Sequence, residues 1–345
     1  MKIIAAIVLL SIAALYGGFL IAGRDVKQLE EKIANIIEKP LEKYTFENLR
    51  KTKFPESLIT VGRLIEEKDE YVSQMFYFNI NNKKVSGLLN TPKEEGIYPV
   101  VIMLRGYVPK EIYETGMGTK RAGEIFAQNG FITLAPDFLG YGESDNPSRD
   151  VMEERFQTYT TLLPLFSSLG NLNEGLTASY SGTIKADTEK VGLWGHSNGG
   201  QIALSTLAIS GKKYPTVLWA PVSKPFPYSI LYYTDDIEDH GKGLRRVVAN
   251  FEKDYDAELY STSNFYSWIN APIEIHQGID DEAVPLKWSN QLVKDLEKSR
   301  RPSGPEARRD VAYFTYPNSD HNLMPEGWDL AITRSTSFFR EHLSE

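Results

Sequence analysis

The chain has 345 residues, of which 41% are hydrophobic and 24% are charged, and its formal net charge is −8 at pH 7. An acidic chain with scattered arginine pairs offers no broad basic surface, so we expect no nucleic-acid partner. The chain contains no cysteine, which excludes thiol nucleophiles, thiolate metal ligands and disulfide bonds.

An apolar run follows Met1 and Lys2 and ends sharply at Arg24. It matches the roughly 20 residues that cross a bilayer. It is longer than the apolar part of most cleaved signal peptides, and no Ala-x-Ala site follows it. We therefore expect residues 1–23 to form a membrane anchor, with the rest of the chain outside the cytoplasm. The alternatives are a cleaved signal, which would make the protein secreted, and a buried core helix.

Residues 24–57 are predicted to form a helical tether. Leu29, Ile33 and Ile36 follow helical spacing until Pro40 interrupts the pattern. The apolar period then changes to that of strands, and residues 58–345 are predicted to form one domain. Its first strands are expected at 58–67, 70–80 and 84–90, with a hairpin turn at Asn81-Asn82 between the last two.

From Tyr98 onward, short apolar strands alternate with helical stretches. This alternation predicts an α/β fold with a mostly parallel sheet of roughly eight strands and helices on both faces. The expected strands are 98–104, 131–136, 191–195, 216–220, 273–277 and 311–317, and the expected helices are 118–129, 199–210, 286–300 and 325–343.

One connection is much longer than the usual few residues, because about 50 residues separate the strands at 216–220 and 273–277. The segment is rich in aromatic side chains. We predict a lid or specificity insertion at about 222–270. Most of its aromatic side chains are expected to pack onto the core, and a few are expected to face a ligand.

Ser197 stands between Gly195 and Gly199 in a Gly-x-Ser-x-Gly pattern. An apolar strand leads into the pattern and a helix-forming stretch follows it. In that context the pattern indicates a sharp strand-to-helix turn that exposes a nucleophilic serine, since the two glycines remove side chains that would collide. The alternative is an ordinary tight turn, because the pattern alone also occurs by chance.

A nucleophilic serine needs a base. Of the five histidines, His321 lies in a polar loop directly after the last predicted strand. His196 lies inside the turn, next to Ser197, and we expect its side chain to point elsewhere. Asp281 is the predicted acid, in the loop after the strand at 273–277. Its neighbours Asp280 and Glu282 are the other candidates in that loop, and Asp320 is an alternative that would only shape the His321 loop.

The oxyanion formed by such an attack requires two hydrogen-bond donors. We assign the first to the backbone N–H of Asn198, the residue after the nucleophile. The second is expected from the loop "LRGYVP" after the strand at 98–104. Gly106 lets this loop turn tightly, which makes the backbone N–H of Tyr107 the candidate.

The order Ser197, Asp281, His321 is that of the catalytic triad in α/β hydrolases. More narrowly, residues 83–345 resemble the catalytic domain of prolyl oligopeptidase-type serine peptidases. The stretches that carry the resemblance are "KKVSGLLNTP", "YPVVIMLRG", "APDFLGYGES", "GHSNGG", "SWINAPIEIHQGIDDEAVP" and "DHNL". The resemblance implies an α/β-hydrolase fold and hydrolysis through an acyl-enzyme.

Two features depart from that family. Its larger peptidases carry an N-terminal β-propeller, and the roughly 60 residues before the sheet are too few for a propeller of four or more blades. We therefore do not expect a propeller-gated peptidase. Arg105 stands where related enzymes usually have His or Tyr. We interpret it either as the partner of an acidic neighbour in an ion pair or as a cation near the oxyanion or an anionic substrate.

These observations predict a serine hydrolase. The first hypothesis is a prolyl oligopeptidase-like peptidase that acts on short peptides, and the alternative is a carboxylesterase or lipase-like ester hydrolase. A non-catalytic binding protein with the same fold is a remote alternative, because such proteins typically lose a triad residue. No metal-ligand or phosphate-loop pattern stands out, so we expect no metal and no other cofactor. The expected partners are a small peptide or ester substrate and, through residues 1–23, a membrane.

Overall fold

A computed structural model describes residues 39–234, 239–299 and 311–343. The predicted anchor at 1–23 and the first part of the predicted tether lie outside these residues, so both stay predictions. Within the described part of the chain, no helix is both long enough and apolar enough to cross a membrane. The chain divides into two units, Met1–Lys43 and Tyr44–Glu345, and every strand belongs to the second.

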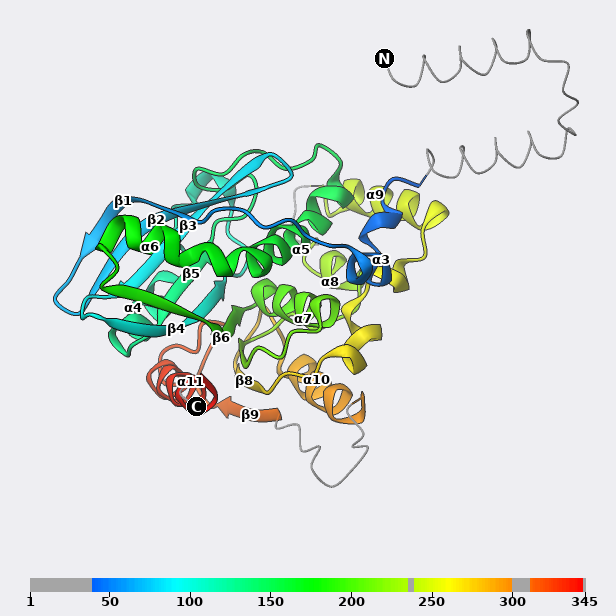
Figure 1. Cartoon of the computed structure of the whole chain (residues 1–345). Coiled ribbons are helices and arrows are strands. Elements are labelled where there is room, and N and C mark those ends of the chain that lie inside the picture. The colour runs from blue at the N-terminus through cyan, green and yellow to red at the C-terminus, as the bar shows by residue number, and fades with distance from the viewer. Residues whose placement is uncertain (1–38, 235–238, 300–310, 344–345) are drawn as a thin grey trace, which may run out of the picture. The chain divides into compact units, whose positions relative to one another are not determined.

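The strands form one sheet, in the order β1-β2-β3-β5-β4-β6-β7-β8-β9 (Figure 1). The sheet confirms the α/β class, with nine strands where roughly eight were predicted. The predicted strand at 191–195 is the end of a longer strand, β6. The bounds are β1 Thr60–Glu67, β2 Tyr71–Ile80, β3 Lys83–Pro92, β4 Gly96–Leu104, β5 Ile132–Pro136, β6 Ile184–His196, β7 Thr216–Trp219, β8 Ile273–Gly278 and β9 Val311–Tyr316.

The first three strands form an antiparallel edge, and the rest of the sheet is parallel. Strand β3 pairs antiparallel with both β2 and β5, whereas the pairs from β5 through β4 to β9 are all parallel. The hairpin turn predicted at Asn81-Asn82 is confirmed. Both residues have positive φ, 47° and 64°, as a two-residue hairpin turn of type I′ requires.

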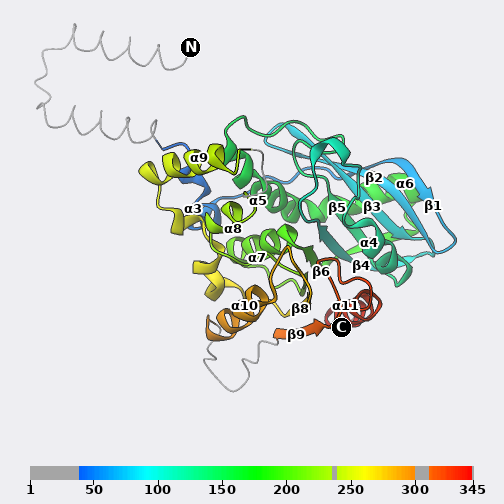
Figure 2. The same cartoon turned by 180° about the vertical axis from the view of Figure 1, so that it is seen from behind.

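Helices cover both faces of the sheet. Helices α4 and α11 contact each other over one face, and α5, α6 and α7 lie over the other (Figures 1 and 2). The sequence predicted α4, α7, α10 and α11 but missed α5 and α6. Helix α5 is buried along most of its length, so it lacks the one-sided apolar stripe that marks a surface helix. The bounds are α4 Lys120–Gln128, α5 Val151–Ser168, α6 Leu172–Tyr180, α7 Asn198–Ser210, α10 Leu286–Ser299 and α11 Trp328–Leu343.

The last part of the predicted tether belongs to the second unit. Helix α3 (Phe46–Lys51) follows the short 3-10 helix η1 (Glu42–Tyr44) and buries Phe46 and Leu49. The Phe46 ring stacks on Phe265 with a centroid distance of 4.9 Å. Phe46 and Leu49 of α3 are therefore part of the hydrophobic core.

The segment between β7 and β8, where an insertion was predicted at about 222–270, contains α8 (Tyr228–Leu231), α9 (Lys242–Asp254) and the 3-10 helices η4 (Ala257–Tyr260) and η5 (Thr262–Trp268). Half of its ten aromatic side chains are buried, and Tyr255 and Trp268 are half-buried. Three tyrosines remain partly exposed and gather around Trp288 of α10. The buried set is Phe226, Phe251, Tyr260, Phe265 and Tyr266, and the exposed set is Tyr228, Tyr232 and Tyr233.

The core under α11 depends on Phe339. Its side chain is fully buried and meets the Phe126 ring edge-on at a centroid distance of 5.3 Å. We expect Phe339→Ala to lower the free energy of unfolding by about 3–5 kcal/mol, because the cavity left behind cannot close completely. Urea unfolding measures this loss. Leu330→Ala on the same helix is the control, since Leu330 is 48% exposed, and a comparable loss there would contradict the burial argument.

Candidate active site

The turn from β6 into α7 holds Ser197 in a strained backbone conformation. Its φ is 55° and its ψ is −120°, values that a residue with a side chain rarely adopts. The packing around the turn requires glycine on both sides. A Cβ atom at Gly195 would lie 2.7 Å from the Gly199 carbonyl oxygen, and one at Gly199 would overlap the carbonyl oxygen of Leu104.

Hydrogen bonds from the neighbouring strand hold this conformation. The Ser197 N–H donates to the Trp219 carbonyl at 2.9 Å, and the Ser197 carbonyl accepts from the N–H of Val222 at 3.0 Å. Helix α7 begins at Asn198, directly after the serine. The turn therefore places Ser197 at the carboxyl end of β6, at the positive end of a helix.

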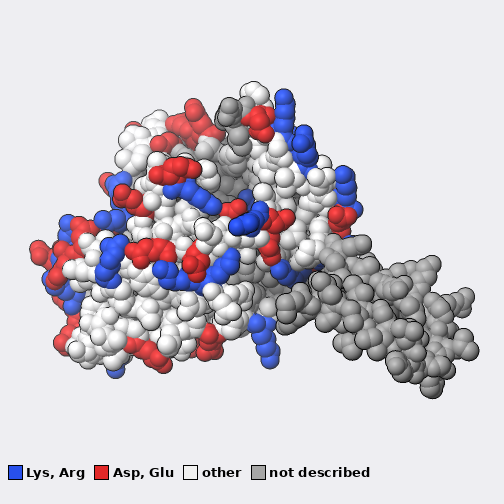
Figure 3. All heavy atoms as spheres, turned by 90° about the horizontal axis from the view of Figure 1, so that it is seen from above, with Lys and Arg blue, Asp and Glu red and all other residues white. Residues whose placement is uncertain are grey.

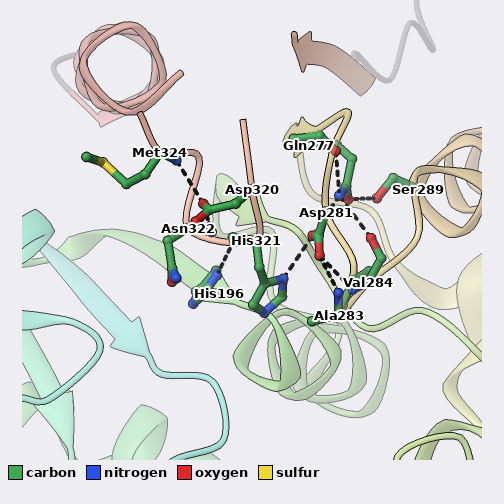
Figure 4. Close-up of polar contacts among 11 residues, drawn as sticks. His196, Gln277, Asp281, Ala283, Val284, Ser289, Asp320, His321, Asn322 and Met324 are labelled. Carbon is green, nitrogen blue, oxygen red and sulfur yellow. Dashed lines mark hydrogen bonds and ion pairs between the residues drawn. The ribbon is translucent and has the colours of Figure 1, made fainter. Parts of the chain in front are cut away.

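His321 and Asp281 come from different loops and form a hydrogen-bonded pair (Figure 4). His321 Nδ1 lies 2.8 Å from Asp281 Oδ2. Asp281 follows β8 and His321 follows β9, so the parallel sheet brings both loops to one edge. Since Nδ1 is held by the carboxylate, Nε2 is the nitrogen left for a serine hydroxyl.

The carboxylate of Asp281 is almost fully buried and is satisfied on both oxygens. Oδ1 accepts from the N–H groups of Val284 and Ala283 at 2.7 and 2.9 Å. Oδ2 accepts from Gln277 Nε2 at 2.9 Å as well as from His321. Burial alone would raise the pKa of Asp281, but the His321 contact and these donors lower it below its usual value. The carboxylate is therefore ionised beside the imidazole.

The sequence analysis missed Gln277, which orients the acid. Its Nε2 contacts Asp281, while its Oε1 accepts from Ser289 Oγ at 2.6 Å (Figure 4). No known motif marks this residue, because a glutamine near the end of a buried strand has no distinctive pattern. The other acidic candidates make no contact with His321: Asp280 and Glu282 are exposed, and Asp320 accepts from the N–H groups of Asn322 and Met324.

Ser197 is linked to the acid loop through packing. Val222, whose N–H bonds to the Ser197 carbonyl, packs with Val284 of the Asp281 loop. Among the described residues, the Ser197 hydroxyl makes no hydrogen bond to His321. Such bonds are often long before substrate binds and tighten in the complex.

We expected the His196 side chain to point away from Ser197. It also contacts the proposed base. Its Nε2 lies 2.9 Å from the His321 carbonyl oxygen, and the two rings are 4.7 Å apart between centroids. Burial, together with the neighbouring His321, lowers the pKa of His196 to about 4. A neutral His196 that donates from Nε2 holds the backbone of His321 in place.

The two backbone groups predicted as oxyanion donors lie at the same site. A Cβ atom at Gly106 would be 3.0 Å from Ser197 Cβ, so the loop after β4 touches the nucleophile turn. Tyr107 and Asn198 line one cavity. Within the described residues, neither backbone N–H donates to another protein group, so both are available to a bound oxygen. The Tyr107 side chain is 77% exposed.

Arg105 is buried beside this loop, and the ion pair considered for it does not form among the described residues. Its guanidinium donates to the carbonyl oxygens of Gly106 and Asp137, at 2.9 and 3.2 Å. It also stacks over the rings of Tyr141 and Tyr113, at 4.0 and 4.6 Å from their centroids. These contacts brace the loop that carries Tyr107.

The cavity has a volume of about 320 Å³ and is walled by the β4 loop, α5, α7, α8 and residues near α9. This volume is at the lower end of the range for small-molecule sites. Elsewhere in the described residues, no three His, Asp or Glu side chains gather in a way that could hold a metal ion.

Two family models match the sequence. The prolyl oligopeptidase family matches residues 174–345, which include Ser197, Asp281 and His321. The chlorophyllase family matches residues 68–218. Among curated proteins, none matches this chain.

Solved structures share the fold at low sequence identity. Acetyl xylan esterase from Paenibacillus sp. R4 has a TM-score of 0.59 and 16% identity, with 86% of this chain and 92% of that chain covered. Est1E from Butyrivibrio proteoclasticus with ferulic acid bound has a TM-score of 0.53 and 17% identity, covering 78% and 99%. A puromycin-hydrolyzing peptidase from Mycobacterium tuberculosis has a TM-score of 0.53 and 14% identity, covering 82% of this chain but only 39% of the peptidase.

The low pKa of His196 predicts a pH-dependent stability. The folded chain releases this proton near pH 4, whereas a histidine in the unfolded chain holds it up to about 6.5. Folding therefore loses stability as the pH falls from about 6.5 towards 4. In His196→Gln, which keeps a donor but cannot titrate, urea unfolding should show a smaller loss, by up to about 1.4 kcal/mol per pH unit. Parallel pH curves for the two proteins would contradict a neutral, buried His196.

The family models, the shared fold and the strained turn at Ser197 all point to the same class of enzyme. Ser197 follows β6, Asp281 follows β8 and His321 follows β9, as their places after predicted strands led us to expect. The chain therefore has the α/β-hydrolase fold and is a serine hydrolase, and its residues 174–345 match the prolyl oligopeptidase family.

Proposed function

We propose that Ser197 is the nucleophile of this hydrolase. Its Oγ attacks the carbonyl carbon of the substrate while His321 Nε2 takes the hydroxyl proton. The protonated His321 then gives this proton to the leaving group, and an acyl-Ser197 ester remains. Water, deprotonated by His321, attacks the acyl carbon, which releases the acid and returns the proton to Ser197. The observation that carries the proposal is the 2.8 Å contact between His321 and Asp281 in loops beside the strained serine.

Asp281 holds His321 in the tautomer that this cycle needs. Its ionised carboxylate accepts the Nδ1 proton, so Nε2 is the basic nitrogen, and it stabilises the imidazolium that forms. The four donors to Asp281 fix the direction of the carboxylate. Because the carboxylate is fixed, the His321 ring is held in one orientation, with Nε2 available to Ser197.

The backbone N–H groups of Asn198 and Tyr107 stabilise the oxyanion. Neither group has a protein acceptor among the described residues, and both residues line the cavity. Removal of one such donor typically costs about 100- to 1,000-fold in kcat. A backbone donor cannot be removed by a side-chain substitution, but Gly106 keeps the loop close enough for Tyr107 to contribute.

The first candidate bond is the amide of a short peptide. The prolyl oligopeptidase match includes all three proposed triad residues, which favours this hypothesis. The second candidate is a carboxylic ester. It is favoured by the structures named acetyl xylan esterase and Est1E, which this chain covers almost completely, and by the chlorophyllase match. The puromycin-hydrolyzing peptidase, in contrast, is more than twice as long as the part covered here.

Ser197→Ala tests the nucleophile. Because the alanine variant lacks the oxygen that forms the covalent bond, we expect it to lose all labelling by a fluorophosphonate probe and all hydrolysis above background. Gel fluorescence measures the labelling. Labelling that persists in the folded variant would refute the assignment. A panel of short peptide amides and acyl esters, given to the wild type, would then rank the two candidate bonds by kcat/KM.

Asp281→Asn tests the acid. An asparagine cannot accept from Nδ1 through its amide nitrogen and would favour the wrong tautomer, so we expect kcat to fall by about 1,000- to 10,000-fold. Steady-state kinetics on an activated ester measures the change. Asp280→Asn and Glu282→Gln are matched controls in the same loop, since both side chains are exposed. An equal loss in either control would argue against Asp281 as the unique partner of His321.

A further inference from the structure

The cavity beside the proposed oxyanion donors contains a second arginine. Arg155, from α5, lines the cavity together with Tyr107 and Asn198. Its side chain is half-buried. One cavity therefore holds both the groups proposed to meet the reacting oxygen and a permanent positive charge.

Arg155 has no carboxylate partner among the described residues. Within the described residues, the one hydrogen bond of its guanidinium runs from Nη2 to Gln201 Oε1 at 3.5 Å, the limit for such a bond. Burial lowers its pKa, but a guanidinium remains protonated in proteins. A partly buried cation without a counter-ion is costly, so its environment favours an anion.

Neighbouring acids are engaged with other partners. Glu154, the adjacent residue, pairs with Lys110 at 2.9 Å. Glu153 accepts from Ser148 Oγ at 2.7 Å. On the face seen from above, acidic and basic side chains are interspersed (Figure 3). Arg155 thus differs from the neighbouring acids, because it has no partner of opposite charge among the described residues.

Arg105 has a different role in the same cavity. Its guanidinium is bound to two backbone carbonyl oxygens and lies between aromatic rings. The carboxylate of Asp137 lies near enough to interact with it electrostatically. Arg105 adds positive potential to the cavity. Two of its donors are held by backbone carbonyl oxygens, and its Nε is buried without a hydrogen-bond partner in the described residues. Arg155 is the more exposed of the two cations.

Part of the cavity wall is apolar, although polar residues also line it, including Glu154, which pairs with Lys110. Met152, Ile202, Ile230 and Leu244 line the cavity. They suit an aliphatic segment that joins a carbonyl group at the oxyanion donors to a negative group at Arg155.

We propose that this cavity binds a carboxylate of the substrate, held by the Arg155 guanidinium, so that the enzyme prefers acyl groups that end in a carboxylate. The inference rests on the proposed function, because it places the scissile carbonyl at Asn198 and Tyr107. The carboxylate could belong to an aliphatic diacid ester or to an acidic peptide, and the chemistry at Arg155 is the same for both.

Matched substrates test the preference. One arm compares mono-p-nitrophenyl esters of the diacids from glutaric to suberic acid with p-nitrophenyl esters of fatty acids of equal length, corrected for spontaneous hydrolysis. The other arm compares succinyl-alanine p-nitroanilide with butyryl-alanine p-nitroanilide. We expect the wild type to favour the anionic member in at least one arm. The arm with the larger ratio of kcat/KM identifies the source of the carboxylate.

Arg155→Met isolates the charge, because methionine keeps much of the apolar length. We expect the anionic-to-neutral ratio of kcat/KM to fall about 10- to 100-fold, as for the loss of one charge-assisted hydrogen bond. Arg149→Met is the control, since Arg149 is exposed and outside the cavity lining, and its ratio should equal that of the wild type. Fluorophosphonate labelling of Arg155→Met confirms that the variant is folded. A ratio that does not change in Arg155→Met would overturn the proposal.

Binding without turnover separates this inference from the proposed catalysis. Calorimetry measures the affinity of adipic acid monomethyl ester for Ser197→Ala and for the double variant with Arg155→Met. Binding that weakens about tenfold or more in the double variant supports the anion site even if no hydrolysis is found. Equal binding, or none, overturns the anion site, and normal hydrolysis of neutral esters would then leave the proposed function intact.

Discussion

The backbone of α7 touches the backbone at the end of β4, and the positions of the reactive groups depend on this contact. The approach is possible only because residue 199 is glycine, since any side chain there would overlap the Leu104 carbonyl. It forces the sharp turn in which Ser197 is strained. It also brings the loop after β4 beside the serine, so that Tyr107 and Asn198, whose N–H groups are the proposed oxyanion donors, line one cavity.

The parallel part of the sheet supplies the other half of the site. Strands β6, β8 and β9 end at the same edge, so short loops bring together residues that are far apart in sequence. The charge of Asp281 can be buried there because backbone amides, Gln277 and His321 all donate to it. Without those donors, burial would raise the pKa of the carboxylate and weaken its hold on the imidazole.

The sequence predicted the parts of the fold and site that follow from period and spacing. The strands, the Asn81-Asn82 turn and four helices have strong local patterns. The pairing of His321 with Asp281 followed from their places after successive strands. Helix α5 was missed because tertiary burial on nearly all sides removes its amphipathic pattern. The contacts of His196 and Gln277 were missed for another reason: they depend on side-chain directions that only the packed structure determines.

The walls of the cavity come from elements that hold no residue of the proposed triad. Helices α5, α8 and the start of α9 form much of it, together with α7 and the loop after β4, whereas the proposed nucleophile, acid and base sit on turns that follow sheet strands. Substitutions at the positions of these helices that face the cavity can therefore change its shape without replacing a residue of the proposed triad. A gene copy of this enzyme would be able to acquire a new substrate through drift in a few helical positions, while selection on the strand ends stayed unchanged.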